Sequence, residues 1–432
     1  MKRFIEENLS EWAKDSHRKP LLLTGARQVG KSYVIEKNLA TSFPSFVKIN
    51  FEKQPEFQAC FNENLSPQNI LPEIEALANQ KIIPGTTLLF LDEIQLCPRA
   101  LTALRYFYED LPSLHIIAAG SLLGFAIEKL SIPVGRLTFR HLTPLSLEEY
   151  LINAGEKIFL ETLQNHSIEK PLPDALHQKG LTLLKDYMAL GGLPEVVDHF
   201  QQTRDYRKCQ DILRDLLEGY RRDFPKYGVK DTDLKYIDLV FDKAPHLVGK
   251  VVKYVEMSRD IQSKYLQKGI NHLVKADILH PVYKTTTVPL AAQCSPGRFK
   301  LNFLDIGLMQ KACGLGIKEW ITQGIRMIHS GALAEQFAGQ QILAHNHFTD
   351  EPLYYWERDQ PNSSAEVDYV IEKNQTMLPI EVKSGTEGKL RSLHLFLKEK
   401  NLPLGLKISM DNYGRNGLIQ SIPLYGLGTW LK

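Results

Sequence analysis

The sequence predicts an α/β protein built from several domains, and three observations support this. In the first third of the chain, short apolar runs alternate with helical patterns, as in a sheet covered by helices. In the last quarter, an α-β-β-β-α-β order can be followed from residue 331. The pattern between these two segments is mainly helical. At 432 residues the chain is too long for one hydrophobic core, and about two to four domains are expected.

The composition is that of an ordinary globular protein. Hydrophobic residues make up 43% and charged residues 24% of the chain. No apolar run approaches the roughly 18 residues of a membrane span, and the N-terminal stretch lacks the apolar core of a signal peptide. The five cysteines show no paired metal spacing. We therefore expect a cytoplasmic protein with reduced cysteines and no membrane contact.

The net charge of +2 hides a basic middle segment. Residues 204–330 carry 22 Lys and Arg against 14 Asp and Glu, whereas the flanking segments are close to neutral or slightly acidic. A basic segment between such flanks suggests a polyanionic partner, for which DNA is the expected candidate. A solvated helical surface explains the same charges equally well.

The first functional motif is GARQVGKS, residues 25–32, which fits the pattern G-x-x-x-x-G-K-[ST]. A short apolar strand precedes it and a helical stretch follows, which is the context of a phosphate-binding loop. Its two glycines let the backbone wrap a phosphate, Lys31 would reach the β- and γ-phosphates, and the Ser32 hydroxyl would ligate Mg²⁺. The predicted ATP-binding residues of this loop are Gly25, Ala26, Arg27, Gln28, Val29, Gly30, Lys31 and Ser32.

A second motif, TTLLFLDEIQ at residues 86–95, is an apolar strand that ends in two acids. Asp92 is expected to hold Mg²⁺ through its water shell, and Glu93 is expected to polarise the attacking water. A phosphate-binding loop combined with such a pair of acids predicts ATP binding and hydrolysis, with ATP and Mg²⁺ as the ligands.

The same domain should contain three further strands, at residues 46–51, 115–121 and 136–141. Ser121 closes one of them at the place of a γ-phosphate sensor, although a helix N-cap explains a serine there equally well. Arg136 and Arg140 flank the last strand. Either is a candidate arginine finger in cis or in trans, with Arg136 favoured, and a strand-edge ion pair is the alternative.

These motifs resemble those of a known family. GARQVGKS, LFLDEIQ, AAGS, the VGR before TFRHLTPLSLEEY, and the later GGLPEVV are together similar to a widespread family of prokaryotic AAA-superfamily ATPases. The resemblance covers nearly the whole chain. It implies a P-loop ATPase core at residues 1–144, whose five-stranded parallel sheet has an extra strand between the two motif-bearing strands. It also implies a helical lid over the nucleotide at residues 145–223 and a C-terminal restriction-endonuclease-like domain.

Residues 224–325 have the outline of a winged helix, because helical patterns are followed by two strand signals, HPVYKTTT and FKLNFLD. Residues 263–277 form the expected recognition helix. The polar side chains that it offers to DNA are Lys264, Lys268, His272 and Lys275. Winged helices also serve as protein-packing modules, and this alternative stays open.

The C-terminal segment, residues 326–432, is expected to fold as a PD-(D/E)XK nuclease core. Asp368, Glu381 and Lys383 form the pattern D-x12-E-x-K. Because strand side chains alternate, Glu381 and Lys383 share one face of their strand. Asp368 and Glu381 would bind Mg²⁺ that activates a water, and Lys383 would orient that water or neutralise the phosphate. Glu335, on the preceding helix, would complete the carboxylate set.

Two functions follow from these features. The first is an ATP-hydrolysing enzyme acting on nucleic acid, in which the ATPase gates a Mg²⁺-dependent nuclease-like domain. The second is an ATP-dependent switch that binds a protein partner or DNA and carries a catalytically silent nuclease fold.

Overall fold

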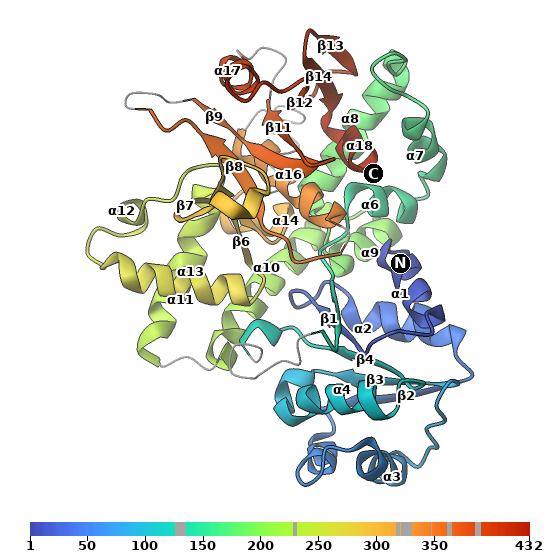
Figure 1. Cartoon of the computed structure of the whole chain (residues 1–432). Coiled ribbons are helices and arrows are strands. Elements are labelled where there is room, and N and C mark those ends of the chain that lie inside the picture. Colours follow the sequence, from blue (N-terminus) through green and yellow to red (C-terminus); the bar gives the residue numbers. More distant parts are fainter. Residues whose placement is uncertain are drawn as a thin grey trace.

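The structure, a computed structural model, describes residues 1–125, 135–227, 231–316, 320, 331–346, 348–360, 365–384 and 390–432. Within these ranges the strands form three sheets. Figure 1 shows the N-terminal sheet at one end of the molecule, the C-terminal strands at the other, and helices between them. The two termini lie on the same side, where the Lys432 ammonium is 3.7 Å from the centre of the Phe4 ring.

The N-terminal sheet has five strands, and all neighbouring strands run parallel. They are β1 (Leu21–Thr24), β2 (Ser45–Asn50), β3 (Thr87–Asp92), β4 (His115–Ala119) and β5 (Thr138–His141). Their order is β2-β3-β4-β1-β5. Strand β4 therefore lies between β1, which leads into the phosphate-binding loop, and β3, which ends in the two acids. The expected five-stranded parallel sheet with an extra strand between the motif-bearing strands is confirmed.

Apolar side chains cover both faces of this sheet. Every residue of β3 is buried, and because side chains alternate across a strand, Leu89 and Phe90 belong to different core clusters. Helices α3 (Pro67–Ala78) and α4 (Pro98–Asp110) pack on one face, and α1 (Ile5–Lys14) belongs to the core of the other. The carboxyl ends of β1 and β3 thus meet at one edge of a buried sheet.

The next part of the chain is helical, as expected. Its helices are α6 (Leu147–Asn153), α7 (Lys157–Gln164), α8 (Asp174–Leu190), α9 (Pro194–Thr203) and α10 (Tyr206–Asp223). Gly191 and Gly192 form the turn between α8 and α9. Gly191 has φ +79°, and a Cβ there would lie 2.0 Å from a carboxylate oxygen of Asp305, so only glycine fits. Asp305 also accepts a hydrogen bond from the Gly192 amide at 2.6 Å.

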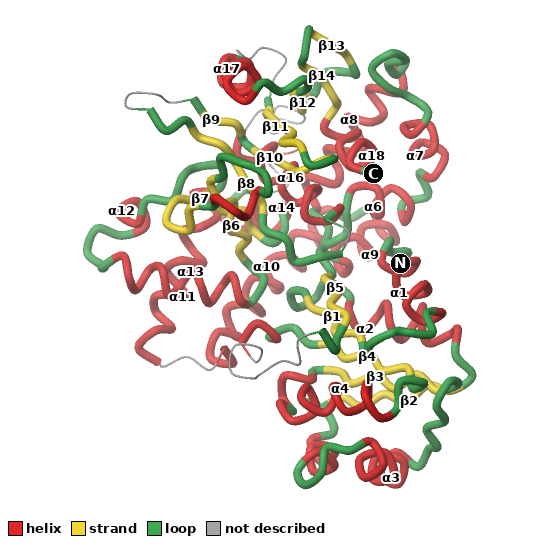
Figure 2. Tube along the Cα trace, viewed as in Figure 1, coloured by secondary structure: helices red, strands yellow, loops and turns green. Residues whose placement is uncertain are grey.

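Helices α11 (Asp231–Lys243) and α13 (Ser263–Lys275) pack against each other, and α12 (Tyr254–Met257) lies between them in sequence. The antiparallel hairpin of β6 (Leu279–Lys284) and β7 (Ser295–Phe303) follows, and then α14 (Ile306–Ala312). Helices followed by a hairpin were expected here, and the winged-helix assignment itself stays a prediction. Strand β6 also pairs in parallel with β8 (Leu353–Glu357). The hairpin therefore belongs to a four-stranded sheet, β7-β6-β8-β9, that joins it to the C-terminal segment (Figure 2).

The C-terminal segment contains the expected α-β-β-β-α-β order, except that the expected second strand is divided at Asp368 into two strands and that two further strands and a helix follow. Its elements are α16 (Gly331–His345), β8, β9 (Glu366–Val367), β10 (Tyr369–Lys373), β11 (Thr376–Val382), α17 (Arg391–Lys400), β12 (Gly405–Ser409), β13 (Gly414–Asn416), β14 (Ile419–Pro423) and α18 (Leu427–Leu431). Strands β10 and β11 are antiparallel, and β11 and β12 are parallel. The expected boundary between residues 325 and 326 lies outside the described residues.

No helix in the described ranges combines the length and the apolar character that crossing a bilayer requires. The five cysteines are free thiols.

Candidate nucleotide site and acidic cluster

The loop of residues 25–32 leaves the carboxyl end of β1 and enters helix α2 (Lys31–Tyr33). Gly25 and Gly30 have φ angles of +131° and +97°, in the region that favours glycine. A Cβ on Gly25 would lie 2.2 Å from the carbonyl oxygen of Leu142. The backbone path therefore requires glycine at position 25 and favours it at position 30, as expected of a loop that wraps a phosphate.

The Lys31 side chain lies inside this loop. It is 8% exposed, and its ammonium donates to the carbonyl oxygens of Gly25 at 2.8 Å and Ala26 at 2.6 Å. Burial lowers the pKa of Lys31 to about 8, although the nearby acids Glu93 and Asp277 oppose this effect. A phosphate bound in the loop would stabilise the charged ammonium, because an opposite charge nearby favours the protonated form.

Ser32 and Asp92, the two predicted Mg²⁺ ligands, lie side by side. The Ser32 hydroxyl is 3.0 and 3.1 Å from the two carboxylate oxygens of Asp92. One of these oxygens also accepts a hydrogen bond from Asn50 Nδ2 at 3.0 Å and lies 2.9 Å from Lys48 Nζ. A hydroxyl beside a buried carboxylate is an oxygen donor set of the kind that Mg²⁺ prefers, so these residues fit the ion. Sequence reasoning missed Asn50 and Lys48, which reach Asp92 from the neighbouring strand β2.

Glu93 follows β3 directly and has φ +52°. Its carboxylate accepts a hydrogen bond from Gln95 Nε2 at 2.6 Å. The Gln95 side chain fits there because position 120 is glycine, where a Cβ would lie 2.2 Å from Gln95 Oε1. Gln95 therefore positions the carboxylate that is predicted to polarise water. Sequence reasoning assigned it no role, although it belongs to the quoted motif.

Ser121 lies two residues beyond the end of β4 and is 5% exposed. Its hydroxyl has no hydrogen-bond partner among the residues that the structure describes, so the N-cap hydrogen bond is not found there. A buried hydroxyl without a partner requires an explanation, and a bound phosphate is one. The role of Ser121 as a γ-phosphate sensor stays a prediction.

Arg136 and Arg140 do not reach the loop in this structure. Strand β5 begins at Thr138, so Arg136 lies at the amino edge of the parallel sheet, opposite the edge that carries the loop. Its guanidinium is 3.1 Å from a carboxylate oxygen of Glu109, which is the strand-edge ion pair. Arg140 donates to the Asn8 side chain on α1. An arginine finger acting in cis does not agree with this geometry, because both guanidiniums lie elsewhere, and a role in trans stays a prediction.

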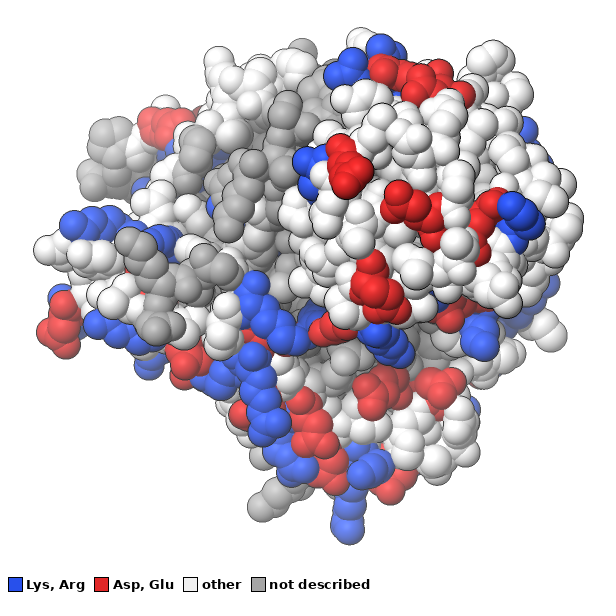
Figure 3. Space-filling view, turned by 90° about the horizontal axis from the view of Figure 1, so that it is seen from below, with Lys and Arg blue, Asp and Glu red and all other residues white. Residues whose placement is uncertain are grey.

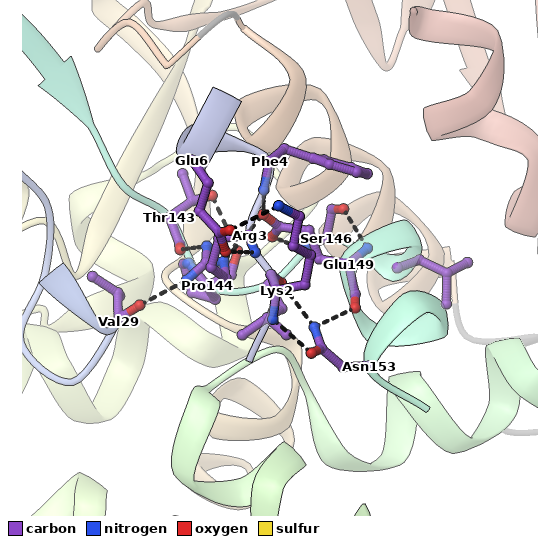
Figure 4. Close-up of polar contacts among 12 residues, drawn as sticks. Lys2, Arg3, Phe4, Glu6, Val29, Thr143, Pro144, Ser146, Glu149 and Asn153 are labelled. Carbon is purple, nitrogen blue, oxygen red and sulfur yellow. Dashed lines mark hydrogen bonds and ion pairs between the residues drawn. The ribbon is translucent and has the colours of Figure 1, made fainter. Parts of the chain in front are cut away.

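The N-terminal segment contacts the phosphate-binding loop through the Arg3 side chain. The buried Arg3 guanidinium donates to the carbonyl oxygens of Val29 at 2.9 Å and Thr143 at 2.7 Å (Figure 4). It also lies 3.1 Å from the Glu149 carboxylate, which accepts a hydrogen bond from the Phe4 amide at 2.7 Å. Arg3 therefore ties the loop to the start of the helical segment.

We expect Arg3→Ala to lower the free energy of unfolding by about 3–5 kcal/mol, because Glu149 is left buried without its cation. Urea denaturation of the full chain measures this. Lys2→Ala is the matched control: the Lys2 side chain is 53% exposed and pairs with Glu6, so the expected loss is about 0–1 kcal/mol. Equal losses in the two variants would contradict the assignment.

Two more elements contact the loop. From helix α10, the Tyr220 hydroxyl donates to the Arg27 carbonyl oxygen at 2.6 Å, and Asp223 forms an ion pair with the Arg27 guanidinium. From the turn after α13, the Asp277 carboxylate accepts a hydrogen bond from the Ala26 amide at 2.8 Å. These contacts tie the helical segment and the β6–β7 region to the nucleotide loop.

A second group of charged side chains gathers in the C-terminal segment. The Asp368 carboxylate accepts a hydrogen bond from the Val382 amide at 2.7 Å, which brings it beside β11. The Lys383 ammonium donates to Glu381 Oε1 at 2.5 Å, and the negative charges of Asp368 and Glu381 both help to raise the pKa of Glu335 on α16. The structure therefore brings the predicted residues Glu335, Asp368, Glu381 and Lys383 together in one acidic cluster.

Lys300 on β7 lies inside this cluster and was not predicted. It is 2% exposed, and its ammonium is 3.6 Å from Glu335 Oε2 and 3.7 Å from Asp368 Oδ1. It also forms an ion pair with Glu366. A single buried ammonium therefore faces three carboxylates, in the kind of position that a metal ion would take.

Two glutamates of this cluster, Glu335 and Glu381, have raised pKa values. Burial raises the pKa of Glu335 to about 8 and that of Glu381 to about 7, and the charge of Asp368 adds to both effects. At neutral pH, protons therefore neutralise part of the negative charge. A divalent cation would compete with these protons, because carboxylates bind metal in the deprotonated form.

The expected recognition helix α13 is partly engaged within the chain. Lys268 forms an ion pair with Asp233 on α11. The His272 ring lies 5.9 Å from the Phe125 ring of the N-terminal domain, and the Lys275 backbone passes so close to Gly124 that a Cβ there would lie 2.7 Å from its carbonyl oxygen. Lys268 and His272, two of the side chains predicted to contact DNA, therefore make contacts within the chain, and Lys275 packs against the N-terminal domain through its backbone.

A pair of stacked tyrosines lies on α11 and α13. The rings of Tyr236 and Tyr265 stack at 4.9 Å with an interplanar angle of 13°. The ammonium of Lys235 lies near the first ring and that of Lys264 near the second, at 5.0 and 4.9 Å from the ring centres, and both lysines are exposed. Figure 3 shows the molecule from below, with many Lys and Arg side chains on the left, the side on which these helices lie in Figure 1.

The parallel sheet, the phosphate-binding loop and the adjoining acids define a P-loop ATPase of the AAA type. In agreement, residues 17–151 match the family described as an AAA domain. Residues 181–319 match a domain of unknown function (DUF8612), and residues 330–427 match another (DUF4143). The predicted AAA-type ATPase domain is therefore confirmed, whereas the nuclease-like assignment stays a proposal.

No curated protein matches the chain. Three solved structures are similar to it at low identity. The Walker-type ATPase paby2304 of Pyrococcus abyssi is 16% identical, with 72% of this chain and 95% of that chain covered and a TM-score of 0.44. The RuvB Holliday junction branch migration motor of Thermotoga maritima is 15% identical, with 68% and 90% covered and a TM-score of 0.32. Drosophila ORC bound to DNA is 14% identical, with 72% and 95% covered and a TM-score of 0.26.

Proposed function

We propose that the chain hydrolyses ATP and that this cycle gates the action of its C-terminal segment on nucleic acid. The observation that carries the proposal is the meeting of Lys31, Ser32, Asp92 and Glu93 at the carboxyl edge of the central sheet. Mg²⁺, when bound, would neutralise charge on the phosphates. The chain itself would supply the amides and ammonium that hold the phosphates, and the Glu93 carboxylate that takes a proton from water.

A continuous path leads from the nucleotide loop to the acidic cluster. The Ala26 amide bonds to Asp277, which lies two residues before β6. Strand β6 pairs with β7, and β7 carries Lys300 into the cluster. A shift of the loop on nucleotide binding would therefore act directly on the hairpin that positions Lys300. This path supports the proposal that ATP binding gates the C-terminal segment. The coupling between the nucleotide loop and the acidic cluster can be measured.

Two features support nucleic acid as the partner. The acidic cluster brings together carboxylates and a lysine, which are the side-chain types that metal-dependent phosphodiester cleavage uses. The stacked tyrosines between Lys235 and Lys264 combine aromatic faces with cations, which is the chemistry that binds single-stranded nucleic acid.

The test is cleavage of supercoiled, branched and single-stranded DNA with Mg²⁺ or Mn²⁺, with and without ATP. We expect Asp368→Asn and Lys383→Ala each to lower the cleavage rate by about 100-fold or more. Glu372→Gln, at an exposed acid on the neighbouring strand β10, is the control and should cleave as the parent does. DNA left intact by the parent under all these conditions would refute the nuclease part.

Lys300 favours the second candidate function, an ATP-dependent switch with a silent nuclease fold. Its ammonium already neutralises the carboxylates that would hold a metal. We expect the parent to bind Mn²⁺ weakly in calorimetry and Lys300→Met to bind it at least about 10-fold more tightly, because removing a like charge favours a cation. Lys398→Met, at an exposed lysine on α17, is the control, and circular dichroism checks folding. Tight Mn²⁺ binding by the parent would count against the silent fold.

A further inference from the structure

Four potential metal ligands meet beside the nucleotide loop, and one of them, Asp277, also contacts the loop. His141 ends β5, Asp277 and His280 flank the start of β6, and Asp350 follows α16. His141 Nε2 lies 3.2 Å from Asp277 Oδ2, and His280 Nδ1 lies 3.6 Å from Asp277 Oδ1. One ligand atom each from His141, Asp277 and Asp350 lies within 4.8 Å of the others. Among the described residues, no other group of three or more His, Cys, Asp or Glu side chains is gathered this closely.

The His141 ring presents one nitrogen to a hydroxyl and the other to a carboxylate. The Thr24 hydroxyl lies 3.2 Å from the Arg140 carbonyl oxygen and 3.1 Å from His141 Nδ1. On the other side of the ring, His141 Nε2 lies 3.2 Å from Asp277 Oδ2. A proton or a metal ion between these two atoms would join them.

The backbone holds these ligands in place before any ion binds. The His141 amide donates to the Phe348 carbonyl oxygen at 2.7 Å, which fixes the segment that carries Asp350. Asp277 has φ +62° and is tied to the Ala26 amide. The side chains of His141, Asp277 and His280 are 8%, 15% and 13% exposed, whereas Asp350 is exposed. The site is therefore largely enclosed and opens to solvent at Asp350.

We propose that His141, Asp277, His280 and Asp350 bind one divalent transition-metal ion of the Zn²⁺ class. Two imidazoles and two carboxylates are ligands that such ions take, whereas Mg²⁺ prefers oxygen ligands alone. With bonds of about 2.0–2.2 Å, tetrahedral ligand atoms lie roughly 3.3–3.6 Å apart. The His141 Nε2–Asp277 Oδ2 distance of 3.2 Å is close to this spacing. His280 Nδ1 lies 3.6 Å from the other Asp277 oxygen, Oδ1, so His280 and the exposed Asp350 are the ligands that have to move closer to the ion.

The metal ion would join three parts of the chain. His141 belongs to the ATPase sheet, Asp277 and His280 to the α13–β6 region, and Asp350 to the C-terminal segment. Because Asp277 also holds the Ala26 amide, the ion would stiffen the link between the nucleotide loop and the hairpin that carries Lys300. This role does not depend on whether the acidic cluster cleaves nucleic acid.

Metal binding by the untagged full chain tests the proposal. After chelation and dialysis, the protein is titrated with Zn²⁺ by calorimetry and with Co²⁺ by visible absorption. We expect one equivalent to bind, with the d–d bands of four-coordinate Co²⁺, and a large excess of Mg²⁺ to leave the spectrum unchanged. His141→Ala and Asp277→Asn should weaken binding by about 100-fold or more, and the exposed Asp350→Asn by about 10-fold. His246→Ala, at an exposed histidine, is the control.

The folding of the variants has to be checked before their metal binding is compared. Circular dichroism checks the folding of the buried variants, and Asp350→Asn, a surface change, keeps the test valid if they do not fold. A parent chain that binds neither Zn²⁺ nor Co²⁺ would overturn the proposal and assign the space between His141 and Asp277 to a proton. Binding that is unchanged in Asp350→Asn and in the folded buried-site variants would also overturn it, because the ion would then lie elsewhere.

Discussion

Lys31→Ala is expected to lower the affinity for ATP by at least about 100-fold, which corresponds to about 2.8 kcal/mol. The Lys31 ammonium is buried within the loop, where it bonds to the carbonyl oxygens of Gly25 and Ala26. We expect the same ammonium to contact the phosphates of a bound nucleotide, and hydrogen bonds from a charged donor contribute about 1.5–3 kcal/mol each. Calorimetry with ATP and Mg²⁺ measures the change directly.

Lys37→Ala is the matched control for this variant. Lys37 lies six residues further along the chain and is exposed, so its loss should leave ATP affinity unchanged. Thermal unfolding separates lost binding from lost folding, because Lys31 also supports the loop. Unchanged ATP affinity in a folded Lys31→Ala protein would show that residues 25–32 are not the nucleotide loop.

Glu93→Gln is expected to lower the rate of ATP hydrolysis by about 10²–10⁴-fold while ATP binding is retained, because an amide cannot take a proton from water. The substitution keeps the size of the side chain and keeps an oxygen that can accept the hydrogen bond from Gln95, which is 2.6 Å long in the parent. The local geometry should therefore survive. Phosphate release under saturating ATP measures turnover, and calorimetry measures binding.

Glu56→Gln, which changes an exposed acid of the same domain, controls for the loss of one negative charge. Hydrolysis by Glu93→Gln at the rate of the parent would move the water-activating role to another group. A variant that loses ATP binding as well would show that Glu93 is a structural residue of the site.

The nucleotide site was predictable because its chemistry is local in sequence. Eight consecutive residues form the loop, and strand ends in a parallel sheet meet at one edge, so Ser32 and Asp92 could be placed together without coordinates. The order of elements in the C-terminal segment was predictable for the same reason, since strand alternation and helical periodicity act over a few residues. Asp368 and Glu381 could be paired because Asp368 directly precedes β10, which pairs with β11, the strand that carries Glu381.

Other parts of these sites had no local signal. Arg3 contacts Val29 and Glu149 from the start of the chain, and nothing in the sequence around it indicates a buried guanidinium. Nothing in the sequence around Lys300 distinguishes it from other strand lysines. It lies beside the acids because the hairpin that carries it joins the C-terminal segment through the pairing of β6 with β8. The prediction of Arg136 as an arginine finger in cis does not agree with the structure for a related reason. Arg136 precedes β5 and therefore lies at the amino ends of the parallel strands, whereas the nucleotide loop lies at their carboxyl ends.

The ATPase fold, the loop residues predicted to face the phosphates, and the acid pair with a nearby lysine could all be derived from the amino-acid order alone. These features depend on short motifs and on the periods of strands and helices. The contacts that other residues make with these features depend on how the elements pack together, and only the tertiary structure shows them. Asp277 reaches the Ala26 amide across 251 residues, and a contact that distant depends on how whole elements pack, for which no short stretch of sequence carries a pattern.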